Sequence, residues 1–146
     1  MEEKIKHLEF VQNVITRMNT NSFQLKGWAI TIVSALLALY ASSTNVIYIF
    51  IAIVPTLIFG VIDASYLQRE RKFIGLYDDI MNDKVKLFSM SIEKYKYNKK
   101  DKETKKYCYC KVFWSGTIAG LYCSMALLLL LIGLFLCFKD CVIVNC

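Results

Sequence analysis

The sequence predicts an all-α membrane protein, and three observations lead to that fold class. Of the 146 residues, 56% are hydrophobic and only 21% are charged, which gives a mean hydropathy of +0.42. A soluble domain of this size buries too small a share of its surface to hide so much apolar material. Six glycines and one proline supply little turn chemistry for a β-rich fold. The apolar residues are clustered in long runs, which are typical of helices in a bilayer.

Residues 1–24 are predicted to form an amphipathic helix that is cytosolic or interfacial. Five apolar residues recur at spacings of three and four, which places them on one face of a helix. Such a helix lies in the headgroup region or packs on a neighbouring helix. The polar residues at 19–22 offer a break or a cap before the first span. The apolar stripe consists of Ile5, Leu8, Val11, Ile15 and Met18.

Residues 25–62 are predicted to form a transmembrane hairpin. Its first span begins near Trp28 and ends near Tyr40, and aromatic residues are the usual anchors at membrane interfaces. An uncharged turn at 42–45 leads into the second span, which contains Pro55. A proline inside a spanning helix removes one backbone hydrogen bond, so we expect a kink there.

Residues 63–111 are predicted to form a basic cytosolic helical stalk and loop. Apolar residues keep three- and four-residue spacings beyond the second span, so we extend that helix to about Tyr95. Seven lysines lie between positions 94 and 106, and two acidic residues there are too few to balance them. This stretch predicts an exposed loop or a frayed helix end.

Residues 112–138 carry no charge and include five consecutive leucines, so they are predicted to form the third transmembrane helix. A short external tail, 139–146, follows. Seventeen of the eighteen Lys and Arg residues lie on the opposite side from the 42–45 turn, and Lys139 is the exception. The positive-inside rule then places the N-terminus and the stalk in the cytoplasm and the C-terminus outside.

Each predicted span carries a row of small residues at spacings of three or four. In lipid, small residues let helix backbones approach closely and so drive helix association. The rows therefore indicate either assembly of a homo-oligomer or the packing of one chain on itself. They comprise Gly27, Thr31, Ser34 and Ala38 in the first span, Ala52, Thr56, Gly60 and Ala64 in the second, and Gly116, Gly120 and Ser124 in the third.

Hydroxyl groups in the first two spans suggest a narrow pore, with Thr31, Ser34 and Thr56 as lining candidates and Asp63 at its mouth. Hydroxyls line pores, and a carboxylate at a mouth favours cations. The alternative is that the hydroxyls bond backbone groups, and that Asp63 is an interfacial charge or part of a surface ion pair. No charged residue lies at the centre of a predicted span, so no proton relay is expected.

Basic residues interleaved with tyrosines after the second span predict a surface for anionic ligands. Lysine attracts phosphate and tyrosine stacks on bases, so a nucleotide or an oligonucleotide fits this pattern. Anionic lipid headgroups fit it as well and are the favoured partner beside a membrane. The candidates are Arg69, Arg71, Lys72, Lys96, Lys99, Lys100, Lys105 and Lys106.

The sequence contains no G-x-S-x-G, P-loop, H-E-x-x-H or glycine-rich dinucleotide motif, so we expect no enzyme. His7 is the only histidine, and on a polar helix face it is expected to be solvated. Of the aspartates at 78, 79 and 83, only the last two share a helix face, and calcium takes six or more oxygen ligands. We therefore predict no metal and no cofactor.

The six cysteines divide by predicted depth. Cys108 and Cys110 lie at the cytosolic membrane edge, where cysteines can be palmitoylated. Cys141 and Cys146 are predicted outside, where a disulfide within or between subunits is chemically allowed.

Four sequence runs carry a resemblance to a known family: NVITRMNTNSF at 13–23, KGW at 26–28, DASYLQRER at 63–71 and LYD at 76–78. Together they resemble a family of small bacterial multi-span membrane proteins associated with antiphage defence operons. The chain is similar in kind to the membrane effector of the Hailong system, a channel-like protein held closed by an oligonucleotide. The resemblance implies a bacterial inner-membrane location, a sensing surface on the basic stalk and a pore in the spans.

Two functions follow as hypotheses. The first is a homo-oligomeric channel-type effector of antiphage defence, gated through the stalk and acting by membrane depolarisation. The second is a non-conducting membrane anchor that recruits a cytosolic partner protein through residues 66–107.

Overall fold

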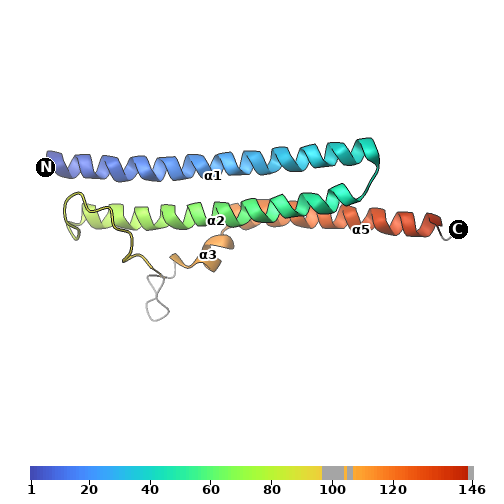
Figure 1. Cartoon of the computed structure of the whole chain (residues 1–146). Helices are drawn as coiled ribbons and strands as arrows, with labels where there is room; N and C mark the ends of the chain where they lie inside the picture. The colour runs from blue at the N-terminus through green and yellow to red at the C-terminus, as the bar shows by residue number, and fades with distance from the viewer. Residues whose placement is uncertain (97–103, 105–106, 145–146) are drawn as a thin grey trace. The chain divides into compact units, whose positions relative to one another are not determined.

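The computed structural model describes residues 1–96, 104 and 107–144, with side chains described up to residue 138. Within these residues the chain consists of helices and loops, which confirms the predicted all-α fold (Figure 1). The helices are α1 (Glu2–Ser43), α2 (Ile47–Met81), α3 (Tyr109–Phe113), α4 (Gly116–Ile118), the π-helical turn η2 (Ala119–Cys123) and α5 (Ser124–Val144).

Three helical segments of the described chain are long and apolar enough to cross a membrane, as predicted. They are α1, α2 and the stretch Gly116–Phe138, which comprises α4, η2 and most of α5. The third segment begins at Gly116 rather than at position 112. The reason is that α3 ends at Phe113 and Ser115 has an extended backbone, with φ −66° and ψ 140°.

α1 runs without interruption through residues 19–22, so the predicted break or cap there is wrong. The side chains that suggested a cap are used differently. The Thr20 hydroxyl donates to the carbonyl of Thr16 (3.0 Å), and the Ser22 hydroxyl donates to the carboxylate of Asp63. Hydroxyl groups that find acceptors inside a helix or on its neighbour no longer compete with the helical backbone.

α2 ends at Met81, so the prediction that it continues to about Tyr95 is wrong. The Asn82 side chain donates to the carbonyl of Asp78 (2.7 Å), and Asp83 has a positive φ of 55°. Asn and Asp tolerate left-handed backbone and compete for backbone hydrogen bonds, which is why they end helices. Earlier in α2, the helix continues through Pro55 without ending there.

The chain divides into two compact units, and α1 and α2 contribute residues to both. The polar unit consists of Met1–Gln24 and Asp63–Trp114, and the apolar unit consists of Leu25–Ile62 and Ser115–Cys146. Sixteen of the eighteen basic and eleven of the twelve acidic residues belong to the polar unit. Each of the two long helices therefore has one part in the charged, polar unit and one part in the apolar unit.

Each unit has its own apolar core. In the polar unit, buried side chains come from α1, α2 and the segment that follows α2: Val11, Leu76, Ile80, Tyr95 and Tyr107. In the apolar unit, the core joins α1, α2 and α5 through Val33, Ile49, Ala52 and Leu129. Close packing of this kind is what holds helices together in lipid.

Candidate functional site

The three rows of small residues do not occupy equivalent places. The row of α2 is buried inside the chain: Ala52, Thr56, Gly60 and Ala64. The other two rows are exposed. They are Gly27, Thr31, Ser34 and Ala38 of α1, and Gly116, Gly120 and Ser124 of the third apolar segment.

The glycines show the difference most directly. A Cβ atom added to Gly60 would lie 3.2 Å from Cγ of Tyr122, and one added to Gly133 would lie 3.1 Å from Cζ of Phe50. At Gly27, Gly116 and Gly120 an added Cβ would meet no heavy atom within 4 Å. Gly60 and Gly133 thus serve contacts within the apolar unit, whereas the three exposed glycines have no such neighbour.

The predicted pore-lining hydroxyls are not gathered on one surface of the chain. Thr31 is exposed and donates to the carbonyl of Gly27 (2.9 Å), while Thr56 is buried and donates to the carbonyl of Ala52 (2.9 Å). Ser34 is exposed on α1. Both threonines bond the preceding turn of their own helix, which was the alternative that the sequence left open.

Asp63 is fully buried in the polar unit, so its carboxylate is not at the surface of this chain. The Ser22 hydroxyl of α1 donates to its carboxylate. A buried carboxylate is costly without hydrogen-bond donors, so this contact ties α1 to α2 at a defined register. The signal was present in the sequence, because an antiparallel hairpin brings together residues at similar distances from its turn.

The basic candidates that the structure describes differ in exposure. Arg69 and Lys96 are exposed, and Arg71 and Lys72 are half-buried. Four further candidates lie outside the described residues: Lys99, Lys100, Lys105 and Lys106.

A tyrosine contact holds the start of the lysine-rich stretch on α2. The Tyr95 hydroxyl donates to Asp79 (2.7 Å), and the Lys94 ammonium lies 2.9 Å from the same carboxylate oxygen. These two donors, Lys94 first, lower the pKa of Asp79. Burial, reinforced by Asp79, raises the pKa of Tyr95 above its ordinary range. This cluster could not be predicted from the apolar spacing, which placed Tyr95 in a continuation of α2.

A second tyrosine holds the other end of the stretch. The Tyr107 ring lies edge-on to Tyr95, with centroids 5.8 Å apart and planes at 69°. Its hydroxyl packs against Gly75, and the Gln68 side chain donates to its carbonyl (2.8 Å). Tyr95 and Tyr107, which flank the lysine-rich stretch in the sequence, therefore both contact α2.

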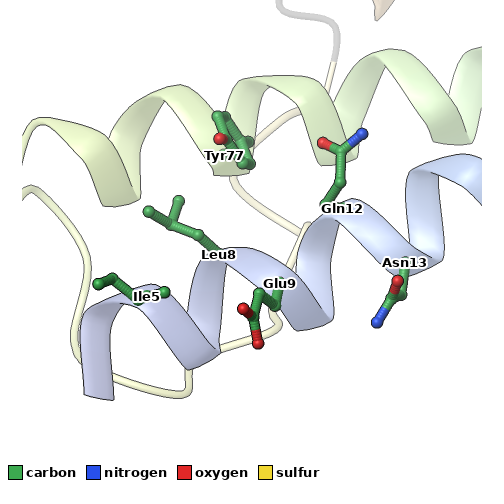
Figure 2. Close-up of a pocket in the computed structure, with 6 residues that line it drawn as sticks. All are labelled: Ile5, Leu8, Glu9, Gln12, Asn13 and Tyr77. Atoms are coloured by element: carbon green, nitrogen blue, oxygen red, sulfur yellow. The ribbon is translucent and has the colours of Figure 1, made fainter. Parts of the chain in front are cut away.

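The polar unit also has a groove of about 420 Å³ between α1 and α2. In Figure 2, Leu8 and Gln12 point toward α2, which contributes Tyr77, while Glu9 and Asn13 point away from it. Apolar side chains with a few polar groups at the border are a usual lining of binding pockets. The lining residues are Ile5, Leu8, Glu9, Gln12, Asn13 and Tyr77.

His7 is 1% exposed, so the prediction of a solvated histidine is wrong. One ring nitrogen lies 3.2 Å from the carbonyl of Ser89, and the other accepts from the backbone N–H of Phe88 (3.2 Å). The helical periodicity indicated a polar face, but the loop after α2 folds over that face. No signal in the α1 sequence alone would have indicated this cover.

Among the described residues, no group of three or more His, Cys, Asp or Glu side chains is placed to hold a metal ion. Cys108 is half-buried and Cys110 is exposed, and both are free thiols. The side chains of Cys141 and Cys146 lie outside the described ones. Comparison with known proteins gives no match, since no family model, curated protein or solved structure is significantly similar to this chain.

Proposed function

We propose that this protein is a homo-oligomeric, channel-type membrane effector of a bacterial inner membrane. The observation that carries the proposal is the placement of the small-residue rows. The row of α2 is used inside the chain, whereas those of α1 and the third apolar segment are exposed. Faces that allow close backbone approach are the surfaces through which helices associate in lipid.

Assembly is also what a pore would require. The hydroxyls of Thr31 and Ser34 are on the exposed row of α1, so several copies are needed to bring such groups around one axis. In an oligomer, the face of α1 that carries these hydroxyls would either line the ion path or form the contact between subunits. Backbone groups, hydroxyls and apolar constrictions are sufficient to build a gated pore.

In the proposed arrangement, the polar unit lies in the cytoplasm and controls the pore. It holds nearly all charges of the chain, and the positive-inside rule places such a unit on the cytoplasmic side. Its basic surface, including Arg69 and Lys96, would bind lipid headgroups or an anionic ligand such as an oligonucleotide. The family resemblance adds antiphage defence, in which opening would depolarise the membrane. No catalytic step is part of this proposal.

The test is a subunit count by native mass spectrometry in nanodiscs, together with ion flux from liposomes. We expect four or more copies, and we expect Gly120→Leu to dissociate them and abolish flux. Thr117→Leu is the matched control, because it adds bulk at an exposed position outside the row. A monomer or dimer in the wild type, or full assembly of Gly120→Leu, would contradict the proposal.

A non-conducting anchor is the second candidate, and the groove beside Tyr77 favours it. A partner protein would then dock on the polar unit through residues 66–107 together with α1. Assembled wild-type protein that passes no ions in liposomes would favour this function over the first one.

A further inference from the structure

The N-terminal turns of α1 hold the loop that follows α2, and His7 is at the centre of this contact. His7 is the only histidine of the chain and is buried. Both of its ring nitrogens contact loop backbone, at Phe88 and Ser89. The Phe88 ring also lies against the imidazole, with centroids 5.7 Å apart and planes at 33°.

The geometry fixes one protonation state of the imidazole. Because the Phe88 N–H is a donor, Nδ1 of His7 must present its lone pair. Nε2 then carries the proton and donates to the carbonyl of Ser89. A second proton on Nδ1 would face the Phe88 N–H, so the imidazolium would lose this bond and would be charged in a buried place.

The loop needs this contact because its backbone is strained. Phe88 has a φ of 59°, in the left-handed region that bulky residues rarely adopt. Lys4 holds the loop at a second point, where its ammonium lies 2.7 Å from Asp83 and donates to the carbonyl of Met81 (3.0 Å). Residues in such conformations persist only where surrounding contacts hold them.

The charged neighbours do not replace the lost bond. Lys4 and Asp83 are already paired, and Asp79 of α2 is engaged by Lys94 and Tyr95. Lys6 is paired with Glu2. The other charged side chains on these turns, in the last turn of α2 and in the described loop are Glu3, Glu9, Asp78, Lys84, Lys86, Glu93 and Lys96.

We propose that His7 is a pH-sensitive latch, which fastens residues 83–89 to α1 at neutral pH and releases them in mild acid. Ile5 and Leu8, on the same turns of α1, line the groove of the polar unit, so the release would change one end of that groove. The latch belongs to the polar unit alone and does not depend on the proposed channel function.

Hydrogen exchange of the full-length protein in nanodiscs tests the latch. We expect the protection of the Phe88 amide, corrected for intrinsic exchange, to fall about tenfold between roughly pH 7.5 and 5.5. His7→Gln should remove this pH dependence, while Lys4→Met, which cuts the second tie, should retain it. Equal pH dependence in wild type and His7→Gln, or none in wild type, would overturn the proposal.

The ring nitrogens give an independent measurement that needs no variant. With ¹⁵N-labelled histidine, the single imidazole gives one pair of resonances, and at neutral pH these should report the neutral Nε2–H form. Imidazolium signals should arise only from the released state, so they should grow in step with the loss of protection at Phe88. An Nδ1–H form at neutral pH, or titration of the ring without loss of protection, would contradict the latch.

Discussion

The two units are built from the same two long helices but are held together by different kinds of contact. The polar unit depends on buried polar groups with specific partners: Ser22 with Asp63, Tyr95 with Asp79, and His7 with the loop after α2. The apolar unit depends on shape, as where Tyr122 lies against Gly60. The hydroxyls of Thr31 and Thr56 in this unit donate to carbonyls of their own helices instead.

This difference follows from the surroundings that each unit is proposed to have. In water, burial of apolar area drives folding, and buried polar groups then fix one arrangement because an unpaired group is costly. In lipid, apolar burial gives no such drive, so close approach of backbones is what remains. Loss of a hydrogen bond should therefore matter most in the polar unit, and added bulk should matter most where glycines make contacts.

Gly75→Val should have the largest effect, because Gly75 is the one described glycine of the polar unit. A Cβ atom there would overlap the Tyr107 hydroxyl and lie 3.1 Å from the Tyr95 ring. We expect the free energy of unfolding of the polar unit to fall by about 3 kcal/mol, the upper range for overpacking. The near-UV circular dichroism of the tyrosines during thermal unfolding would measure it. Gly27→Val is the control, since its added side chain meets nothing within 4 Å. An equal loss in both variants would point to a backbone effect rather than to the tyrosine contact.

Gly60→Ala and Gly120→Ala separate the two roles of small residues. The added methyl at Gly60 would press on Tyr122 at 3.2–3.5 Å, so we expect the apolar unit to lose about 1–2 kcal/mol. At Gly120 the methyl is unopposed within the chain, so the monomer should keep its stability and only subunit association should weaken. Resistance to dissociation in mild detergent and thermal unfolding of the dissociated chain would measure the two effects. Matching losses of monomer stability would remove the distinction between the rows.

Much of the fold could be predicted because it depends on local composition. Runs of apolar residues determine where the three long helices lie, and charge clustering distinguishes the polar part of the chain. The end of α2 was missed because apolar spacing continues beyond it: Val85 and Ile92 pack on the polar core from a loop. A helical period in such residues cannot be told from a loop that happens to bury the same positions.

The candidate site was less predictable, because it depends on contacts between distant residues. Periodicity showed that small residues line three helices, but not which row the chain itself would cover. Asp63 and His7 both looked like surface groups in their own helices, and partners 41 and 81 residues away bury them. The hairpin brings Ser22 and Asp63 to similar heights, but their exact register and the path of the loop over His7 are not specified by one sequence.

Tyr95→Phe should have the smallest effect, and it tests the contribution of buried hydrogen bonds to the stability of the polar unit. Loss of the hydroxyl bond to Asp79 should reduce the free energy of unfolding by about 1 kcal/mol at neutral pH. Tyr77→Phe, at a half-buried tyrosine against the same core, is the control.

The pH dependence of that stability gives the sign of each contribution. The pKa of Asp79 is lowered in the folded chain, first by Lys94 and then by Tyr95. Its contribution is therefore present above the ordinary aspartate pKa, about 3.9, and is lost as the pH falls below it. The pKa of Tyr95 is raised, chiefly by burial, so its contribution is present below about pH 10 and is lost above. Tyr95→Phe should reduce both the alkaline loss and the acid loss, whereas Tyr77→Phe should keep both. An unchanged alkaline loss in Tyr95→Phe would show that this tyrosine does not contribute through its hydroxyl.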